Sequence, residues 1–218
     1  MNGPIELLRS DPLAFLLLAV ALLQAIALHE FAHAYAADLQ GDRMPRAMGR
    51  VSLNPMRHLD PMGTLAIFLI GFGWGKPVEF RMAALSSQRF GAAIVALAGP
   101  MMNVLLAFVG AIAYRLSGVS FLDTGFAGAL AELFLNFVSI NVVLAVFNLI
   151  PLPPLDGSRL LTIFLPPSKQ RVIFFLDQYG FLILLGFLFL TGFAFLSPLL
   201  ENIQCWVVEV TGAAQCLG

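Results

Sequence analysis

The 218-residue chain has few charged side chains, three histidines and two cysteines. Charged residues make up 11% of it, against about 25% in an ordinary soluble domain. It also lacks a basic cluster, an internal repeat and a Ser/Gly-rich linker. These absences argue against a soluble globular protein, a nucleic-acid-binding protein and a chain of several domains. We expect one membrane-embedded domain over 1–218, with a core at about 13–165 and a C-terminal helix and tail at 172–218.

Apolar residues dominate instead, at 59% of the chain with a mean hydropathy of +0.88. Runs of about 20 apolar residues are the length of membrane-spanning helices. The fold class expected is therefore an all-α polytopic membrane protein, a multi-helix transmembrane bundle. The predicted helices are three spans at about 13–37, 90–114 and 126–149, a short apolar helix at 158–165 and a longer one at about 172–196.

Two segments between the first spans do not fit this pattern. Residues 62–72 are apolar but too short for a full span, which favours a short re-entrant segment. The following stretch WGKPVEFRM alternates weakly and contains Pro77, which favours a small β-hairpin or an edge strand. A segment at Val78–Phe80 could then receive an extended substrate by strand addition. An amphipathic loop on the membrane surface fits the same residues equally well.

The motif HEFAH at 29–33 lies near the end of the first predicted span. His29 and His33 are four residues apart, so they share one face of a helix and can reach the same metal ion, with Glu30 beside them. The alternative is a pair of histidines packed in a helix bundle. Ionisable groups within a membrane span are costly and mark functional sites, which favours the metal.

A catalytic zinc needs a third protein ligand. Asp156 is the candidate, in the sequence NLIPLPPLDG at 148–157. Its three prolines cannot sustain a helix, and unwound backbone at membrane depth must line a cavity or be buried in protein. The alternative for Asp156 is an N-cap for the helix that follows.

Three stretches resemble the site-2 protease family of intramembrane zinc metalloproteases, namely HEFAH, AGPMMN at 98–103 and NLIPLPPLDG. The stretches LNPMRHLDPMGT and GWGKPV resemble its compact prokaryotic subgroup. The resemblance implies one zinc ion held by His29, His33 and Asp156, with Glu30 as general base. It also implies that Asn148 and Asn103 hold the substrate backbone or the oxyanion, and that a transmembrane segment of a membrane protein is cleaved within the bilayer. For both asparagines, hydrogen bonds between helices remain the alternative.

Two other function classes deserve comparison. A metal-ion transporter could use the same His and Asp residues, but it would not need Glu30. A membrane-anchored protease that acts on soluble proteins would need an extramembrane catalytic domain, and no segment is long enough for one.

Charge predicts the topology. Residues 38–90 carry seven Lys/Arg and 150–171 carry three, whereas 117–125 and 198–218 carry none. Basic loops stay cytoplasmic, so we expect the active site toward the cytoplasmic side of a prokaryotic plasma membrane, provided that 62–72 returns to the side it entered from. The tail then lies outside, where Cys205 and Cys216 could pair. His58 fits either a structural role or a regulatory one.

Overall fold

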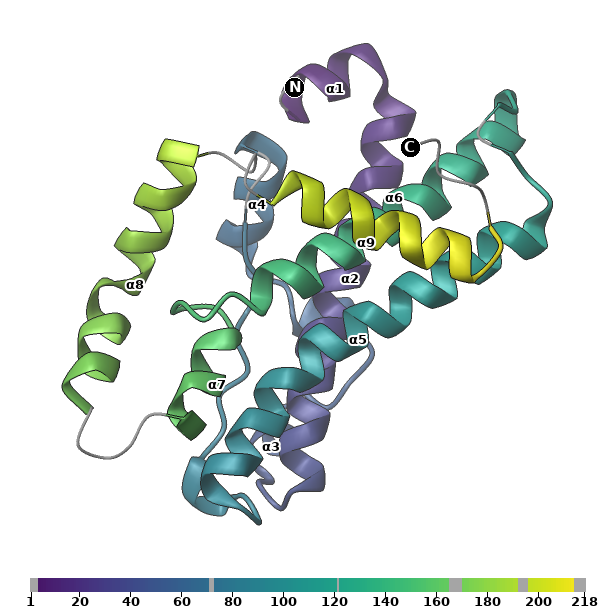
Figure 1. The fold of residues 1–218 in the computed structure, drawn as a ribbon. Coiled ribbons are helices and arrows are strands. Elements are labelled where there is room, and N and C mark those ends of the chain that lie inside the picture. Colours follow the sequence, from purple (N-terminus) through teal and green to yellow (C-terminus); the bar gives the residue numbers. More distant parts are fainter. Residues whose placement is uncertain (1–3, 71–72, 121, 165–169, 192–195, 214–218) are drawn as a thin grey trace.

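The computed structural model describes residues 4–70, 73–120, 122–164, 170–191 and 196–213. Its described residues are mostly helical (Figure 1). The helices are α1 (Pro4–Ser10), α2 (Pro12–Leu39), α3 (Met44–Ala47), α4 (Pro61–Ile70), α5 (Gln88–Ser117), α6 (Gly125–Asn148), α7 (Gly157–Phe164), α8 (Gln170–Thr191) and α9 (Ser197–Val210), with 3₁₀ turns η1 (Pro55–Arg57) and η2 (Met82–Ala84).

The three predicted spans correspond to α2, α5 and α6, which are long and apolar enough to cross a membrane. Helix α2 begins where the sequence indicates, because Asp11 caps it by accepting a hydrogen bond from the Ala14 amide at 3.0 Å and Pro12 occupies its first position. Helix α5 ends at Gly118, whose φ of +70° is the left-handed conformation that favours glycine. The chain is therefore a multi-pass membrane protein.

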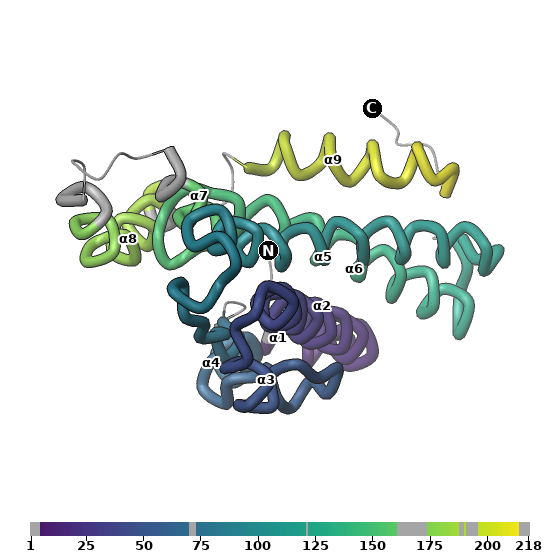
Figure 2. The backbone as a smooth tube through the Cα atoms, turned by 90° about the horizontal axis from the view of Figure 1, so that it is seen from below, coloured from purple at the N-terminus to yellow at the C-terminus, as the bar shows by residue number. Residues whose placement is uncertain are grey.

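The helices are arranged in layers (Figure 2). Helices α5 and α6 lie side by side in the middle layer, with α2 packed on one side of them and α9 on the other. Helix α8 lies apart from these layers (Figure 1) and approaches the chain at Pro153, where a side chain at Gly180 would come within 2.7 Å of the Pro153 carbonyl oxygen. The end of the predicted 172–196 helix lies outside the described residues.

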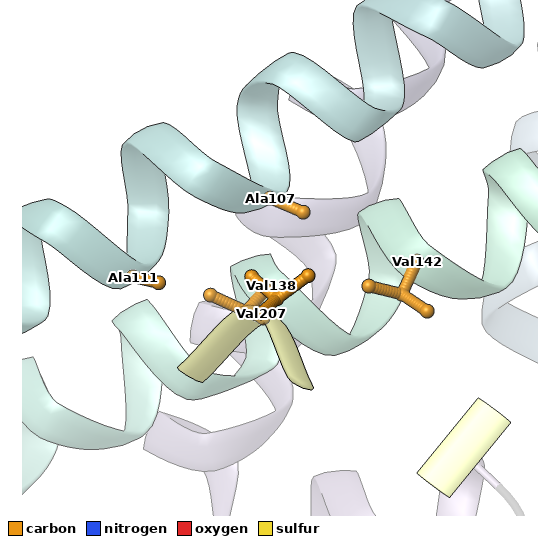
Figure 3. Close-up of a cluster of buried hydrophobic side chains, with 5 residues drawn as sticks. All are labelled: Ala107, Ala111, Val138, Val142 and Val207. Atoms are coloured by element: carbon orange, nitrogen blue, oxygen red, sulfur yellow. The ribbon is translucent and has the colours of Figure 1, made fainter. Parts of the chain in front are cut away.

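The tail contains a helix that the sequence analysis did not predict. Val207 of α9 packs in a buried cluster with residues of α5 and α6, namely Ala107, Ala111, Val138 and Val142 (Figure 3). At the end of α9, Arg115 of α5 donates a hydrogen bond to the Thr211 carbonyl oxygen at 2.7 Å. Helix α9 thus ends at the same end of the bundle as the 118–124 loop. Cys205 in α9 is disulfide-bonded, and Cys216 lies outside the described residues.

The segment around α4 starts and ends at neighbouring points. Leu59 and Gly75 form an antiparallel bridge, and the Lys76 amide donates to the His58 carbonyl oxygen at 2.7 Å. The buried guanidinium of Arg50 ties the same two ends together, because it donates to the carbonyl oxygens of Arg57, Lys76 and Pro77. This geometry is that of a segment which returns to the side from which it entered.

The prediction of a β-hairpin or edge strand was wrong. The described residues contain no strand, and Leu59–Gly75 is an isolated bridge. Side chains, and not a second strand, bind the backbone at both ends of Val78–Phe80: Arg50 binds the Pro77 carbonyl, and Asp42 accepts from the Arg81 amide at 2.5 Å. Pro77 also removes one donor that a ladder would need.

Candidate metal centre

Helix α2 carries His29 and His33 one turn apart, and their Nε2 atoms lie 3.0 Å from one another. Asp156 approaches from the loop between α6 and α7. Its Oδ2 atom lies 3.1 Å from Nε2 of His29 and 3.3 Å from Nε2 of His33. Both histidines are buried, at 6% and 7% exposed. The structure therefore brings together the three predicted ligands, although Asp156 lies 127 positions after His29 in the chain.

The three ligand atoms form a nearly equilateral triangle, which can be compared with the size of a zinc site. Zinc binds nitrogen and oxygen at about 2.0–2.1 Å in tetrahedral geometry, so two of its ligand atoms lie about 3.3 Å apart. The observed sides of 3.0, 3.1 and 3.3 Å are close to that value. One face of a tetrahedron is thus provided by the protein, and the fourth corner is left for a reactant.

The hydrogen bonds on the far side of each ring fix which nitrogen can bind a metal. Nδ1 of His33 lies 2.7 Å from the Val95 carbonyl oxygen. A carbonyl oxygen only accepts, so this Nδ1 carries the proton and Nε2 presents a lone pair. Nδ1 of His29 lies 2.5 Å from Oδ1 of Asn103 and is protonated in the same way. Such outer partners hold the rings of metal ligands in place.

Lone pairs therefore face one another at the centre of the site. In the neutral rings that a metal binds, a proton on each Nδ1 leaves neither Nε2 with a proton to offer, and Oδ2 of Asp156 is buried with no hydrogen-bond partner. Buried polar atoms rarely stay unsatisfied. Three acceptors at about 3 Å repel each other unless a cation lies between them, so the donor set fits zinc.

Glycines make room for this arrangement. A Cβ atom at Gly99 of α5 would lie 2.6 Å from Nε2 of His29 and closer still to Nε2 of His33. Val95, Gly99 and Asn103 follow one another at intervals of four residues, so they lie on one face of α5. On that face, the Val95 carbonyl accepts from His33, Gly99 leaves space for both rings, and the Asn103 carboxamide accepts from His29. At Gly157, a Cβ atom would lie 2.5 Å from the Ile150 carbonyl oxygen, so the tight turn after Asp156 requires glycine.

Glu30 lies beside the three ligands and is not one of them. Its carboxylate interacts electrostatically with His29, His33, Asp156 and Arg50. It lies against Gly75 at the end of the re-entrant segment, where a Cβ atom would come within 3.3 Å of Glu30 Oε1. Within the described part of the chain its carboxylate makes no hydrogen bond.

The two predicted asparagines occupy different positions. Asn103 is fully buried, and its carboxamide is engaged with His29, Asn141 and the Ala25 carbonyl oxygen. Its position is thus behind His29 and not at the open corner. Asn148 is half-buried at the end of α6, where its amide donates to the Leu144 carbonyl oxygen at 3.0 Å. No contact joins Asn148 to the three ligands among the described residues.

The sequence analysis missed Asn141 and the role of Gly99. Asn141 is a polar residue in the middle of the apolar run of α6, and that position alone marks it as a candidate functional residue. Gly99 lies in the AGPMMN stretch, but the space it leaves for the two rings depends on how α5 packs against α2.

Outside the spans, buried charges hold the loops around the site. Burial raises the pKa of Asp42, but hydrogen bonds from Arg81 outweigh burial and hold that pKa below its usual value. Burial lowers the pKa of the Arg50 guanidinium, whose donors serve backbone carbonyls. His58 is fully buried, with Nε2 bonded to the Ser52 carbonyl oxygen at 2.6 Å. This bond ties His58 to the loop before α4, and its Nδ1 atom is buried without a hydrogen-bond partner among the described residues.

Comparisons with known proteins point to the same chemistry. A profile of Peptidase family M50 matches residues 17–132 and 123–190. A Bacillus subtilis (strain 168) protein, YwhC, whose name describes a zinc metalloprotease, is 37% identical over 174 residues, which cover 77% of this chain and 78% of the relative. Rip2 from Mycolicibacterium smegmatis and from Mycobacterium tuberculosis (strain H37Rv), also named as zinc metalloproteases, are 33% and 32% identical over 78% of this chain and 66% of theirs. No solved structure matches the chain.

The family profile, the relatives and the triangle of ligand atoms agree with one another. The chain belongs to peptidase family M50, the site-2 protease family, and is a membrane-embedded zinc metalloprotease.

Proposed function

We propose that this protein is an intramembrane endopeptidase that hydrolyses a peptide bond within or next to a transmembrane segment of another membrane protein. The observation that carries the proposal is the position of the ligand triangle, which is formed by α2 and the α6–α7 loop and packs against α5. His29 lies seventeen residues from the start of α2, or about 25 Å along it, and ten residues from its end, or about 15 Å. Two of the three ligands are thus carried well inside a helix long and apolar enough to span a membrane, which supports a substrate that reaches the site from within the bilayer.

His29, His33 and Asp156 would hold the zinc ion, which supplies a Lewis acid that polarises the scissile carbonyl and activates water. Glu30 is the general base: it takes a proton from the attacking water and passes it to the leaving amine. Its lack of a hydrogen-bond partner among the described residues and its electrostatic interaction with all three ligands support this role. Asn148, at the end of α6, remains a candidate donor to the developing oxyanion or the substrate backbone.

A substrate helix hides its peptide bonds in its own hydrogen bonds, so it must unwind before it is cut. The stretch Val78–Phe80 forms no strand, and its backbone makes no hydrogen bond within the described chain. It follows Gly75, where an added Cβ atom would lie 3.3 Å from Glu30 Oε1. These backbone groups are thus available to an extended substrate, which supports strand addition.

The orientation proposed is the one that charge predicts, with the 38–90 and 150–171 segments on the cytoplasmic side of a prokaryotic plasma membrane. The bridge between Leu59 and Gly75 supports it, because it keeps residues 38–60 and 74–89 on one side.

The test is cleavage of a transmembrane peptide by the purified full-length protein in detergent, with and without a chelator. We expect cleavage that stops on chelation and returns with zinc. Glu30→Gln should lower the rate by about 10²- to 10⁴-fold, the usual contribution of a general base. Bound zinc should stay near one per chain in that variant, because Glu30 is not a ligand. Stoichiometric zinc without any cleavage by the unaltered chain would favour a metal transporter or a metal-binding protein.

A further inference from the structure

Three spanning helices are joined by a buried chain of hydrogen bonds that ends at a metal ligand. Nδ1 of His29 in α2 donates to Oδ1 of Asn103 in α5 at 2.5 Å. Nδ2 of Asn103 donates to Oδ1 of Asn141 in α6 at 2.8 Å. Nδ2 of Asn141 donates to the carbonyl oxygen of Phe137, one turn earlier in α6, also at 2.8 Å. Both asparagines are completely buried.

This chain has a single possible direction. The Phe137 carbonyl oxygen can only accept, so Asn141 must present its NH₂ group there and its oxygen toward Asn103. Asn103 must then present its NH₂ group to Asn141 and its own oxygen to His29. The oxygen accepts, so the proton of His29 is held on Nδ1 and the lone pair on Nε2, which faces Asp156 and His33.

The two histidines differ in the group that holds the proton on Nδ1. Nδ1 of His33 donates directly to a backbone carbonyl, that of Val95, which cannot turn around. The partner of His29 is a carboxamide, which could bind the ring equally well after a half-turn by donating its NH₂ group to Nδ1. That orientation would leave the proton of His29 on Nε2 and would block metal binding. Asn103 therefore needs a second residue to hold its orientation.

We propose that Asn141 is a positioning residue for zinc, which acts through Asn103 to keep the Nε2 lone pair of His29 directed at the metal. The inference rests on the proposed ligand set His29, His33 and Asp156. Asn141 touches neither zinc nor substrate, and its contribution is to zinc affinity. Outer partners of metal-bound histidines typically change metal affinity by about 10- to 100-fold when they are removed.

The plain alternative is that Asn103 and Asn141 only join the helices, as asparagine commonly does in membrane bundles. That role would affect the thermal stability of the zinc-free protein and leave zinc affinity unchanged. Stability and affinity must therefore be measured separately.

The experiment measures the zinc dissociation constant of the full-length protein in detergent by competition with a chelator, and the thermal midpoint of the zinc-free form. Asn141→Leu keeps a similar volume but removes the acceptor for Asn103, and we expect zinc to bind about 10- to 100-fold more weakly. Asn141→Asp, whose carboxyl group burial keeps protonated, can donate its O–H to the Phe137 carbonyl oxygen and accept from Asn103, so its zinc affinity should stay within a few-fold of the unaltered chain. Asn136→Leu is the matched control, because Asn136 lies in the same helix and has no side-chain hydrogen bond among the described residues.

Unchanged zinc affinity in Asn141→Leu would overturn the inference, and a lower thermal midpoint in that case would assign the residue to helix packing. If the Leu variant does not fold, Asn141→Ser gives the same test, because its shorter hydroxyl leaves the Asn103 amide without its acceptor. Failure of the ligand set looks different: His29→Ala and Asp156→Ala would then bind zinc as tightly as the unaltered chain.

Discussion

Leu59 and Gly75 face one another across an antiparallel bridge, on either side of the apolar helix α4. The two residues are neighbours although the chain between them is apolar enough to enter a bilayer. The helix and the returning chain pack tightly, because Gly63 lies against the Trp74 carbonyl oxygen with no room for a side chain. The two ends of the apolar segment thus lie together, which is the arrangement that the proposed orientation requires.

The first prediction concerns this topology. Single cysteines at Leu53, Ser87 and Leu122, all exposed, are introduced into a chain whose native cysteines are replaced by serine. An impermeant thiol reagent applied to intact cells should label position 122 alone, because 53 and 87 lie on the cytoplasmic side. All three positions should react after the cells are opened. Labelling of just one of positions 53 and 87 in intact cells would show that 62–72 crosses fully.

The second prediction concerns Asp156. Asp156→Ala removes one of three ligand atoms, so zinc should bind more weakly by more than the roughly 10- to 100-fold typical of outer partners. Activity should be lost with it. Asp156→Asn should retain part of the zinc, because its amide oxygen is a neutral and poorer ligand. Metal content after dialysis measures both, and full zinc and activity in the Ala variant would return Asp156 to the role of a helix cap.

The third prediction concerns Gly99. The Cβ atom of Gly99→Ala would overlap both ligand nitrogens, so the rings must move apart and zinc and activity should both fall by at least tenfold, as for lost outer partners. Gly186→Ala in α8 is the matched control, since a Cβ atom there meets nothing within 4 Å. It should keep zinc and activity. A Gly99→Ala variant with the zinc affinity of the unaltered chain would show that the α2–α5 contact is looser than described.

The spans and the ligands could be predicted from the sequence because each depends on a local pattern. Apolar runs of span length predict α2, α5 and α6, and the four-residue spacing of His29 and His33 predicts a shared face. The bonds of Asn103 could not be predicted, because they depend on the rotation of α5 and α6 about their axes. The same holds for α9, whose burial depends on the small residues Ala107 and Ala111 that lie about 100 positions earlier.

The predicted strand failed for a different reason. The weak alternation of apolar and polar residues around Val78 indicates a side-chain pattern that suits a strand. A strand also needs a neighbouring strand to which its backbone can hydrogen-bond. That neighbour is absent from the described chain because Arg50 and Asp42, two charged residues in an earlier loop, bind the flanking backbone groups. A pattern of alternation carries no information about such distant side chains.

The last prediction concerns pH and His58. Burial lowers the pKa of His58 from its ordinary value of 6.5, Arg50 lowers it further, and the bond to the Ser52 carbonyl opposes them without reversing the shift. In the unfolded chain His58 takes up a proton below about pH 6.5, whereas in the folded protein it stays neutral to lower pH. Because the unfolded state then binds more protons, the stability contributed by neutral His58 is fully present above pH 6.5 and is lost as the pH falls toward the folded pKa.

The measurement is the thermal midpoint of the zinc-loaded protein in detergent from pH 8 to pH 5, compared with His58→Gln. The Gln side chain can donate to the Ser52 carbonyl oxygen and does not titrate. Both chains share His29, His33 and every carboxylate, so the difference between their midpoints isolates position 58. We expect the unaltered chain to lose a few degrees more than the variant as the pH falls below 6.5. Parallel curves for the two chains would contradict the burial of a neutral His58 in the folded loop.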